Sequence, residues 1–518
     1  MNPLSKYCDT HAHLIFHQFD NDKEEVIKRA FDSGVSRIVC VGVDIESSKK
    51  CIELSETDAR IWASAGIHPN EVEKTYEKDF DEIRRLAYHP KIVAIGETGL
   101  DYYREKTSRE KQRKAFKRHI EIVRELELPL IIHIREAHEE ALEIINEEKY
   151  YHGVMHAFSG NRDFLQEAIR KEFYIGLGGP ITFENYEKKE LIKEIPEENI
   201  LTETDCPYLS PHPYRGKRNE PARVILVAKR IAKIKGKEEA EIVRTIAGNT
   251  ARLFGFTNPA QRQSREKLSQ TFLKNKGIVE KIALLVEENK IILEIGAGKG
   301  ILTKALSQKA KRLIAVELDE EKAITLSEEK LPNTIVINKD ILSIDIARVS
   351  RYYEEKISVF GNIPYSITSP ILFWLLQNKE GFDKAIIMVQ KEVAARLLAK
   401  PRTKEYGIPT VILGRSFHLK KKFDVSPGSF LPKPKVFSTV IELKTRGQEV
   451  LPGIEKAIFT RIVRNAFAHR RKKVITNLRA VSTEIDWEKE LANIGKGTNT
   501  RAEELTIEDF CRLAEKLQ

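Results

Sequence analysis

The chain has 518 residues, which is enough for two to four domains that each bury a core of their own. Hydrophobic residues make up 41% of it and charged residues 32%, as in an ordinary soluble protein, and no apolar run approaches the length of a membrane span. Five scattered cysteines without a CxxC pair favour reduced thiols, and no apolar stretch follows Met1. We therefore expect a cytoplasmic protein without a secretion signal, a membrane span or a disulfide framework.

Charge is distributed unevenly along the chain. Residues 1–258 contain 41 Lys and Arg against 45 Asp and Glu, a net charge of −4, whereas residues 259–518 contain 46 against 32, a net charge of +14. A strongly basic half predicts a polyanionic partner, most simply a nucleic acid, although charge alone does not distinguish RNA from DNA. A basic domain without such a partner is the alternative.

Short apolar runs alternate with charged, helix-like segments throughout residues 1–258. Segment 108–127 is typical of the latter, because its Glu, Lys and Arg recur at helical spacing. Eight strands that alternate with helices over about 250 residues predict an α/β fold, the (β/α)8 TIM barrel. The eight runs are residues 7–11, 37–42, 61–68, 92–97, 130–134, 153–158, 174–179 and 200–205.

Side chains that bind metals stand at the ends of several of these runs. His11 and His13 alternate along one strand end, so both imidazoles point to the same face. Because the active sites of such barrels lie at the C-terminal strand ends, we expect the set to converge there on two divalent ions, with Zn²⁺, Mn²⁺ and Mg²⁺ as alternatives. Two ions would clamp the attacking and leaving oxygens of a phosphodiester, and Asp205 would hold the attacking water and accept its proton. The predicted metal ligands are His11, His13, Glu97, His133, His156 and Asp205. A structural role is equally expected for any one of these histidines alone, and it is the set of six that predicts a metal-dependent hydrolase.

The motifs that carry these residues resemble those of the TatD family of metal-dependent deoxyribonucleases. They are Asp9-Thr-His-Ala-His13, Gly66-Ile-His-Pro69, Gly96-Glu-Thr-Gly-Leu-Asp-Tyr-Tyr103, His133-Ile-Arg135, His156-Ala-Phe-Ser-Gly160 and Glu203-Thr-Asp-Cys-Pro-Tyr208. The resemblance covers all of residues 1–258 and implies 3′ exonuclease action on DNA, with RNA or small phosphoesters as alternative substrates. It implies that the six residues bind metal and that His68 contacts substrate phosphate. The alternative for His68 is a rim histidine packed under Pro69.

A new pattern begins after a short polar connector at residues 257–265. A helix is expected over 270–287 and a strand over 291–295, followed by a glycine-rich turn and a second helix. Further strands are expected at 312–317, 334–338, 357–360, 384–389, 417–423 and 436–443. This doubly wound α/β pattern predicts a Rossmann-like fold, and helices are expected from Gly453 onward. We expect domains at 1–258, 268–446 and 447–518, with a connector at 259–267.

The glycine-rich turn Glu294-Ile-Gly-Ala-Gly-Lys-Gly300 lies between the expected strand and helix, where glycine lets the backbone approach a nucleoside closely. Nicotinamide cofactors use a similar turn, so the turn alone is ambiguous. Glu317 ends the next strand, where a carboxylate can accept both ribose hydroxyls, and Asp340 is placed to bind an adenine amine. Either acid alone would be a surface charge, but in this register the set predicts an S-adenosyl-L-methionine site.

The sequence Gly361-Asn-Ile-Pro-Tyr365 follows the fourth expected strand. The N6 amine of adenine is a poor nucleophile because its lone pair is delocalised into the ring. The side-chain oxygen of Asn362 and the carbonyl of Pro364 can accept hydrogen bonds from the two N–H groups of this amine. Tyr365 can stack on a base that has flipped out of its helix. We therefore expect Asn362, Pro364 and Tyr365 to be catalytic residues of an adenine N6 methyltransferase. A proline-containing turn after a strand is the alternative.

Residues 264–518 resemble the rRNA adenine N6,N6-dimethyltransferase family, also called KsgA or RsmA. The matching stretches are Leu268-Ser-Gln-Thr-Phe-Leu273, Leu293-Glu-Ile-Gly-Ala-Gly-Lys-Gly300, Val316-Glu-Leu-Asp319, residues 361–372, Gln390-Lys-Glu-Val-Ala-Ala-Arg396, Phe430-Leu-Pro-Lys-Pro-Lys-Val436, Ala466-Phe-Ala-His-Arg-Arg-Lys472 and Arg501-Ala-Glu-Glu-Leu505. The resemblance implies dimethylation of two adjacent adenines in the 3′-terminal hairpin of 16S rRNA in the small ribosomal subunit. The cofactor residues that it implies are Gln270, Thr271, Leu273, Gly296, Gly298, Glu317, Asp340 and Asn362. Thr271 departs from the family, which usually has Asn there, because Thr keeps a hydroxyl but lacks the side-chain amide of Asn.

A basic segment in the last domain is the expected rRNA contact. Arg470, Arg471, Lys472 and Lys473 are predicted to bind phosphates in a salt-dependent way, with a solvated helix face as the alternative. Phe430 is expected either to close the base pocket or to lie in the core. The whole pattern predicts a bifunctional enzyme, a nuclease-like hydrolase joined to an rRNA dimethyltransferase. Two alternatives remain open: a barrel that hydrolyses small molecules or RNA, and a basic half that acts mainly as a ribosome-assembly checkpoint.

Overall fold

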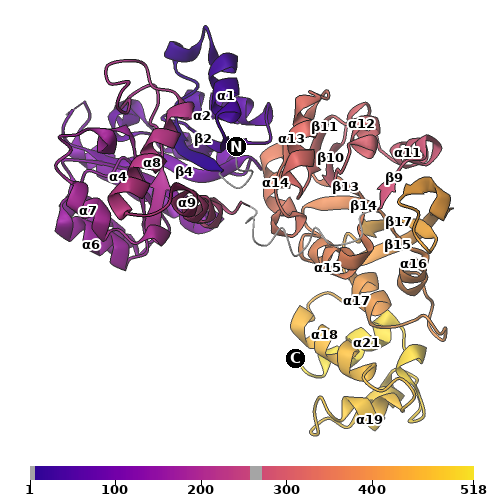
Figure 1. The fold of residues 1–518 in the computed structure, drawn as a ribbon. Coiled ribbons are helices and arrows are strands. Elements are labelled where there is room, and N and C mark those ends of the chain that lie inside the picture. Colours follow the sequence, from indigo (N-terminus) through magenta and orange to yellow (C-terminus); the bar gives the residue numbers. More distant parts are fainter. Residues whose placement is uncertain (1–5, 105, 257–270) are drawn as a thin grey trace. The chain divides into compact units, whose positions relative to one another are not determined.

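The computed structural model describes residues 6–104, 106–256 and 271–518. They form two compact units, one built mainly from the N-terminal half of the chain and one mainly from the C-terminal half. Figure 1 draws the first from indigo to magenta and the second from pink to yellow. None of the helices in these ranges is long and apolar enough to cross a membrane. The predicted connector at 259–267 and the predicted cofactor residue Gln270 lie outside the described residues.

Eight strands form one sheet in the N-terminal unit, in the order of the chain from β1 to β8, and each pairs with the next in parallel. Their bounds are Tyr7–Ala12 for β1, Val35–Val41 for β2, Ile61–Ala65 for β3, Ile92–Asp101 for β4, Leu130–Arg135 for β5, Gly153–Met155 for β6, Tyr174–Leu177 for β7 and Ile200–Thr202 for β8. An isolated parallel bridge between Ala12 and Cys206, and a 2.9 Å hydrogen bond from the Asp205 N–H to the His11 carbonyl, join the last strand to the first. The sheet is therefore closed, and the predicted TIM barrel is confirmed.

Helices follow the strands and cover the outside of this sheet (Figure 1). They are α1 Lys23–Asp32, α2 Ile45–Glu56, α3 Glu77–Ala87, α4 Arg109–Leu126, α5 His138–Glu148, α6 Arg162–Arg170, α7 Lys189–Glu194, α8 Val224–Lys235 and α9 Glu239–Phe254. Helix α4 illustrates why these segments are helical. The Ser108 side chain caps it by accepting from the Lys111 N–H, and Phe116, Ile120 and Val123 recur at helical spacing on its buried face.

Two kinds of boundary differ from the prediction. Strand β4 continues past Glu97 to Asp101, and its pairing with β5 shifts between Ile95 and Thr98, so Glu97 lies within the strand at an irregular position. Strand β8 instead ends at Thr202, before Asp205. Asp205 has a φ of 54°, in the left-handed region that a strand does not use, so the backbone is no longer extended there.

The C-terminal half of the chain forms a second sheet, which has seven strands in the order β12-β11-β10-β13-β14-β17-β15. Their bounds are Thr334–Ile337 for β12, Arg312–Val316 for β11, Ile291–Ile295 for β10, Ile357–Asn362 for β13, Phe382–Gln390 for β14, Ser438–Thr445 for β17 and Phe417–Val425 for β15. Strand β10 pairs in parallel with β11 and β13, and β13 pairs in parallel with β14. Strand β17 is antiparallel to both of its neighbours, β14 and β15. This arrangement confirms the predicted Rossmann-like sheet.

The helices of the C-terminal half of the chain fall into two groups. Those between the strands are α11 Lys276–Ala283, α12 Ile301–Ser307, α13 Glu320–Glu328, α14 Ile346–Tyr353, α15 Thr368–Gln377, α16 Lys391–Leu397 and α17 Ile408–Ser416. Those after the last strand are α18 Lys456–Ala466, α19 Val474–Leu478, α20 Trp487–Asn493 and α21 Ile507–Glu515. Figure 1 shows α18, α19 and α21 gathered beyond α17 at the yellow end of the chain. The expectation of helices after Gly453 is therefore confirmed.

The helix predicted over 270–287 is much shorter than expected. Helix α11 covers only Lys276–Ala283. Asn275 is its N-cap, because the Asn275 side chain accepts a hydrogen bond from the Ile278 N–H, so the helix begins there and not near residue 270. Before it, residues Phe272–Leu273 form strand β9, which pairs with strand β16, Phe430–Leu431. This pairing brings the segment before the first helix to a loop more than 150 residues later in the chain, a long-range contact that helical periodicity does not predict.

Candidate functional sites

Two histidines of β1 begin the barrel site. The Nε2 atoms of His11 and His13 lie 3.2 Å apart, and both rings are buried. The Nδ1 atom of His13 lies 3.0 Å from the Val41 carbonyl, a contact that turns its Nε2 atom toward His11. The alternation along β1 thus places both imidazoles on one face, as the sequence predicts.

Two carboxylates complete a compact set of ligand atoms. The Glu97 Oε2 atom lies 3.4 Å from His11 Nε2 and 3.7 Å from His13 Nε2. The Asp205 Oδ1 atom lies 3.3 Å from His13 Nε2 and 3.9 Å from His11 Nε2. Bonds of about 2.0–2.1 Å in a tetrahedral site separate ligand atoms by about 3.3 Å. The spacing and chemistry of these donors therefore fit a divalent cation.

A second group of imidazoles gathers around the other oxygen of Glu97. Its Oε1 atom lies 2.8 Å from His133 Nδ1, 3.5 Å from His68 Nε2 and 3.8 Å from His156 Nε2. Three overlapping groups of ligand atoms result, namely His11 with His13 and Asp205, His11 with Glu97 and His156, and His68 with Glu97 and His133. All six predicted ligands are brought together, and His68 joins them beside His133. Glu97 is placed between the groups, as a bridging ligand would be.

Charge in the site also favours a cation. Burial opposes ionisation of Glu97, but the imidazoles of His68 and His11 hold the pKa of its carboxyl well below its usual range. Burial is likewise outweighed at Asp205, where the hydrogen bond with His13 lowers the pKa. Burial alone would lower the pKa of His156, but nearby carboxylates raise it to about 10. The buried carboxylates are thus ionised and demand positive charge close by.

Two acidic residues that support the ligands were missed by the sequence reasoning. The Oε2 atom of Glu203 lies 3.1 Å from His156 Nδ1, and its Oε1 atom accepts from the Ala157 N–H at 2.6 Å. Asp101 Oδ2 lies 3.4 Å from His133 Nε2. Each acid therefore faces the ring nitrogen opposite the one that faces Glu97, the usual arrangement behind a metal-binding histidine. The signal was present for Glu203, which lies two residues before Asp205 in the predicted apolar run 200–205.

The glycine-rich turn of the C-terminal unit follows β10 as predicted. Gly298 has a φ of 57°, and a β-carbon there would lie 3.4 Å from the ring of Phe272, so the turn is tight and covered on that side. At Gly296 a β-carbon would meet nothing within 4 Å, which leaves room beside the turn for a ligand. Hydrogen bonds from the N–H groups of Gly296 and Ala297 to the Val316 carbonyl hold the turn against β11.

The remaining cofactor residues lie after the C-terminal ends of neighbouring strands. Glu317 directly follows β11, is buried, and accepts from the Asp319 N–H at 2.8 Å. Asp340 follows β12 and is half-buried, and Asn362 ends β13. Because these strands neighbour β10 or each other in the sheet, the topology places them at one edge together with the glycine-rich turn. This edge is where nucleotide ligands bind in open α/β sheets, so the residues present fit S-adenosyl-L-methionine.

Asn362 is held in a defined orientation. Its Nδ2 atom donates to the Thr271 carbonyl at 3.3 Å, which leaves its side-chain oxygen to accept from another group. Because Thr271 contributes its backbone, this contact does not depend on the side chain at that position. Tyr365 is fixed as well, since its hydroxyl lies 2.7 Å from the buried Ser438 hydroxyl.

Leu273 and Phe430 have a packing role. They are paired in the small β9–β16 sheet and are only 5% and 1% exposed, within the hydrophobic core next to the larger sheet. Of the two roles expected for Phe430, the structure places its ring in the core.

The basic segment after α18 divides into two parts. The guanidinium of Arg470 is engaged by Glu503 at 2.9 Å and by the carbonyls of Thr403, Lys404 and Tyr406. The next three side chains, Arg471, Lys472 and Lys473, are exposed, and no ion pair within the described residues engages them. Arg470 therefore anchors the segment to a neighbouring loop, and the three following cations face solvent.

Both halves of the chain are similar to known proteins. The family model described as TatD related DNase matches residues 8–255, and that described as ribosomal RNA adenine dimethylase matches residues 261–518. A Bacillus subtilis protein described as an uncharacterized metal-dependent hydrolase is 44% identical over 249 residues, which cover 48% of this chain and 98% of that protein. The ribosomal RNA small subunit methyltransferase A of Syntrophus aciditrophicus is 40% identical over 263 residues, 49% of this chain and 93% of the relative. The 3′-5′ ssDNA/RNA exonuclease TatD of Shigella flexneri is 34% identical over 256 residues, 48% of this chain and 98% of the relative.

Proposed function

We propose specific substrates and residue roles for this chain, which belongs to the TatD-related DNase family through residues 8–255 and to the ribosomal RNA adenine dimethylase family through residues 261–518. The first half is a metal-dependent hydrolase of the TatD type, and the second is an rRNA adenine dimethyltransferase. We assign residues 1–258 to the hydrolase barrel and 259–267 to a connector. Residues 268–446 form the methyltransferase domain and 447–518 a helical rRNA-binding domain.

The barrel is a 3′ exonuclease that acts on single-stranded DNA or RNA. The observation that carries this proposal is that the Nε2 atoms of His11 and His13 lie 3.2 Å apart and that one carboxylate oxygen each of Glu97 and Asp205 lies 3.3–3.9 Å from both of them. Divalent ions held there supply Lewis-acid chemistry to a phosphodiester and to water. Asp205 accepts a proton at its carboxylate, which its lowered pKa keeps ionised.

The other residues of the barrel site orient this machinery. The two carboxylate oxygens of Glu97 face different groups of imidazoles. His133 and His156 would bind the metal ion on the side of the Oε1 atom. Glu203 fixes the ring of His156. His68, next to His133 in the same group, binds metal or substrate phosphate.

Incubation with end-labelled single-stranded DNA and RNA, separately with Mg²⁺, Mn²⁺ and Zn²⁺, tests the nuclease. We expect metal-dependent shortening by the wild type and a loss of about 100-fold or more in Asp205→Asn. Asp32→Asn, which neutralises an exposed acid of α1, is the matched control and should keep full activity. If a preparation that still methylates small subunits shortens neither polymer with any metal, the barrel is instead a hydrolase of small molecules.

The C-terminal half dimethylates two adjacent adenines in the 3′-terminal hairpin of 16S rRNA, within the small ribosomal subunit. S-adenosyl-L-methionine supplies the methyl group when it is bound at the edge that carries Gly296, Glu317 and Asp340. The observation that carries this proposal is the orientation of Asn362, whose Nδ2 atom is engaged by Thr271. Its side-chain oxygen accepts one N–H of the target amine, and the Pro364 carbonyl accepts the other.

Two further groups position the rRNA. The ring of Tyr365 stacks on the flipped adenine and is held by the hydrogen bond between its hydroxyl and Ser438. The exposed cations Arg471, Lys472 and Lys473 bind rRNA phosphates, while Arg470 anchors their segment through Glu503.

Methylation of small subunits that lack the two dimethyladenosines tests this half, with labelled S-adenosyl-L-methionine and mass spectrometry of the 3′-terminal fragment. The wild type should add four methyl groups to the two adjacent adenines, and Asn362→Ala should reduce the rate by about 100-fold or more. Asn493→Ala, an exposed position of α20, should behave as wild type. Labelling of any other nucleotide would overturn the assigned target. Full methylation by Asn362→Ala would overturn the role of Asn362.

A further inference from the structure

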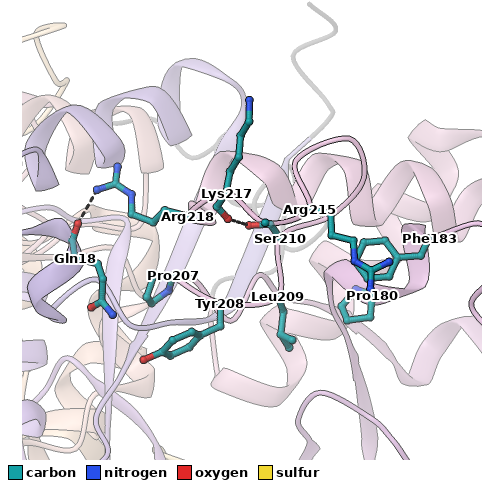
Figure 2. Close-up of a pocket in the computed structure, with 11 residues that line it drawn as sticks. Gln18, Pro180, Phe183, Pro207, Tyr208, Leu209, Ser210, Arg215, Lys217 and Arg218 are labelled. Carbon is teal, nitrogen blue, oxygen red and sulfur yellow. Dashed lines mark hydrogen bonds between the residues drawn. The ribbon is translucent and has the colours of Figure 1, made fainter.

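A hollow of about 470 Å³ lies in the barrel beside the metal-binding residues, and its role is not explained by the six ligands. Residues 207–218 form most of its wall, and Gln18, Pro180 and Phe183 complete it. We call it the Arg215 hollow. Figure 2 shows Arg215 lying over Phe183 and Pro180 at one end, Lys217 extending outward from the rim, and Tyr208 at the other side. Its volume lies within the range of about 300–1,000 Å³ that small-ligand sites occupy.

Tyr208, which lines the hollow, connects it to the metal-binding residues. Tyr208 follows Asp205 by three positions, and its N–H donates to the Asp205 carbonyl at 2.9 Å. The ring of Phe16 stacks on the ring of His13 at 4.6 Å between centroids and meets the ring of Tyr208 edge-on at 6.3 Å. A ligand that lies in the hollow is therefore next to a group bound at His13 and Asp205.

The charge of the hollow is positive. Its lining includes Arg215, Lys217 and Arg218 and contains no acidic residue. Arg218 is neutralised, because both of its terminal nitrogens bind the carboxylate of Asp22, at 2.7 and 2.6 Å. Arg215 rests on the face of Phe183, 4.7 Å from the ring centroid, and neither Arg215 nor Lys217 pairs with an acid in the described part of the chain. Two cations are thus left to bind an anionic ligand.

The backbone that carries these cations is fixed before any ligand arrives. The Ser210 hydroxyl donates to the Lys217 carbonyl, and Arg223 donates to the Arg218 carbonyl at 2.6 Å. Gly179 is required on the facing segment, because a β-carbon there would lie 1.8 Å from the Leu209 carbonyl oxygen. Because this loop is already ordered, it loses little conformational entropy when a ligand binds.

The hollow also presents an aromatic face. Tyr208 is 50% exposed, and its hydroxyl has no hydrogen-bond partner among the residues that the structure describes. An exposed aromatic ring and unpaired cations that line one hollow are a combination that binds single-stranded nucleic acid, since bases stack on the ring and the cations contact phosphates. Small anionic substrates would need the cations but not the ring.

We infer that the Arg215 hollow binds the nucleotide next to the scissile phosphodiester of a single-stranded nucleic acid. Arg215 and Lys217 contact its phosphate, and Tyr208 stacks on its base. The inference rests on the proposed nuclease activity and adds to it the residues that select a polynucleotide over a small phosphoester.

Steady-state kinetics test this on the full chain with two substrates. One is a single-stranded oligonucleotide, and the other is bis(p-nitrophenyl) phosphate, which has one phosphate and no neighbouring nucleotide. The double variant Arg215→Gln/Lys217→Gln should lower kcat/KM for the oligonucleotide by about 10- to 100-fold and leave the small diester within twofold. It should also flatten the log–log salt dependence of oligonucleotide KM by about 0.7, because the two cations contact one phosphate and each phosphate neutralised on a single strand contributes about 0.7.

Matched variants separate this role from general effects of charge and folding. Lys28→Gln/Lys114→Gln removes two exposed lysines from the outer helices α1 and α4 and should change neither substrate. Tyr208→Ala should lower oligonucleotide kcat/KM by about tenfold, and Tyr208→Phe should restore it, since stacking needs the ring only. Unchanged oligonucleotide kinetics in the double variant would overturn the inference. An equal loss on both substrates would also overturn it, because the loop would then act through the metal-binding residues.

Photo-crosslinking gives a readout that does not depend on cleavage. A single-stranded oligonucleotide with 5-iodouracil at its 3′ end should crosslink to the peptide that contains Tyr208, and the double variant should lose this crosslink. If the wild type crosslinks there but cleaves no polynucleotide, the proposed nuclease fails while the hollow remains a nucleic-acid site. If the wild type cleaves but no crosslink maps to residues 207–218, the hollow fails while the nuclease stands.

Discussion

The carboxylate of Glu203 lies 3.1 Å from Nδ1 of His156, on the side of the ring opposite the Nε2 atom that faces Glu97 and Asp205. A carboxylate in this position fixes the ring and increases the basicity of its inward nitrogen. Its removal should therefore weaken metal binding even though Glu203 is not itself one of the grouped ligands.

Replacement of Glu203 by Gln should raise the metal concentration required for half-maximal hydrolysis by about 10- to 100-fold. A titration of activity against Mn²⁺, with calorimetric measurement of metal binding, checks this. Glu187→Gln, an exposed position, is the control and should not shift the curve. If Glu203→Gln loses turnover at saturating metal but keeps its metal affinity, Glu203 does not act by strengthening the binding of metal through His156.

A buried histidine outside the metal-binding set should make the barrel sensitive to acid. His119 is fully buried; its Nε2 atom accepts from the Ile67 N–H at 3.1 Å, and burial lowers its pKa to about 4. In the unfolded chain His119 binds a proton near its ordinary pKa of 6.5, whereas in the folded barrel it does so only near pH 4. Between pH 6.5 and pH 4 protonation therefore stabilises the unfolded state relative to the folded one. The folded barrel should lose up to about 3 kcal/mol over this window.

Urea unfolding of the barrel at pH 7 and pH 4 measures this contribution. His119→Gln keeps a neutral side chain near the Ile67 N–H but cannot take up the proton. Its free energy of unfolding should fall less than that of the wild type between the two pH values. Equal losses in the two proteins would show that His119 does not titrate in this window.

The hydrogen bond between Tyr365 and Ser438 should contribute to methyl transfer by holding the aromatic ring. Ser438→Ala and Tyr365→Phe should each lower the rate of methylation by about fivefold, the value for one hydrogen bond of ~1 kcal/mol. The double variant should lose no more than either single one, because both remove the same interaction. Additive losses would assign the two hydroxyls to separate roles.

The departure from the family pattern at Thr271 should have little effect. The structure engages Asn362 through the Thr271 carbonyl, which any residue supplies. Thr271→Ala and Thr271→Asn should therefore both stay within about threefold of the wild type in kcat and in KM for S-adenosyl-L-methionine, since neither removes the backbone contact. A large gain of cofactor affinity in Thr271→Asn would show that the side chain does contact the cofactor.

Residues on regular elements were the most predictable part of this protein. His11 and His13 share a face because side chains alternate along β1, and Glu317 and Asn362 lie at the same sheet edge as the glycine-rich turn because neighbouring strands end there. The convergence of the six ligands follows from the closure of the barrel, which the alternation of strands and helices predicts.

Contacts made by irregular segments could not be predicted in the same way. The pairing of β9 with β16 joins short segments that have no periodicity of their own. The Arg215 hollow depends on a loop that is held by hydrogen bonds such as that of Ser210, and on a close approach at Gly179. The engagement of Arg470 by Glu503 also arises only from tertiary packing, so the sequence presents all four basic residues as equivalent.

Two separate active sites on one chain should be separable by mutation. The decisive experiment assays the wild type, Asp205→Asn and Asn362→Ala for both shortening of single-stranded oligonucleotides and methylation of small subunits. We expect Asp205→Asn to lose only the first activity and Asn362→Ala only the second, each by about 100-fold or more. Loss of both activities in either variant, in protein that remains folded by circular dichroism, would contradict this expectation, as would a wild type that performs only one reaction.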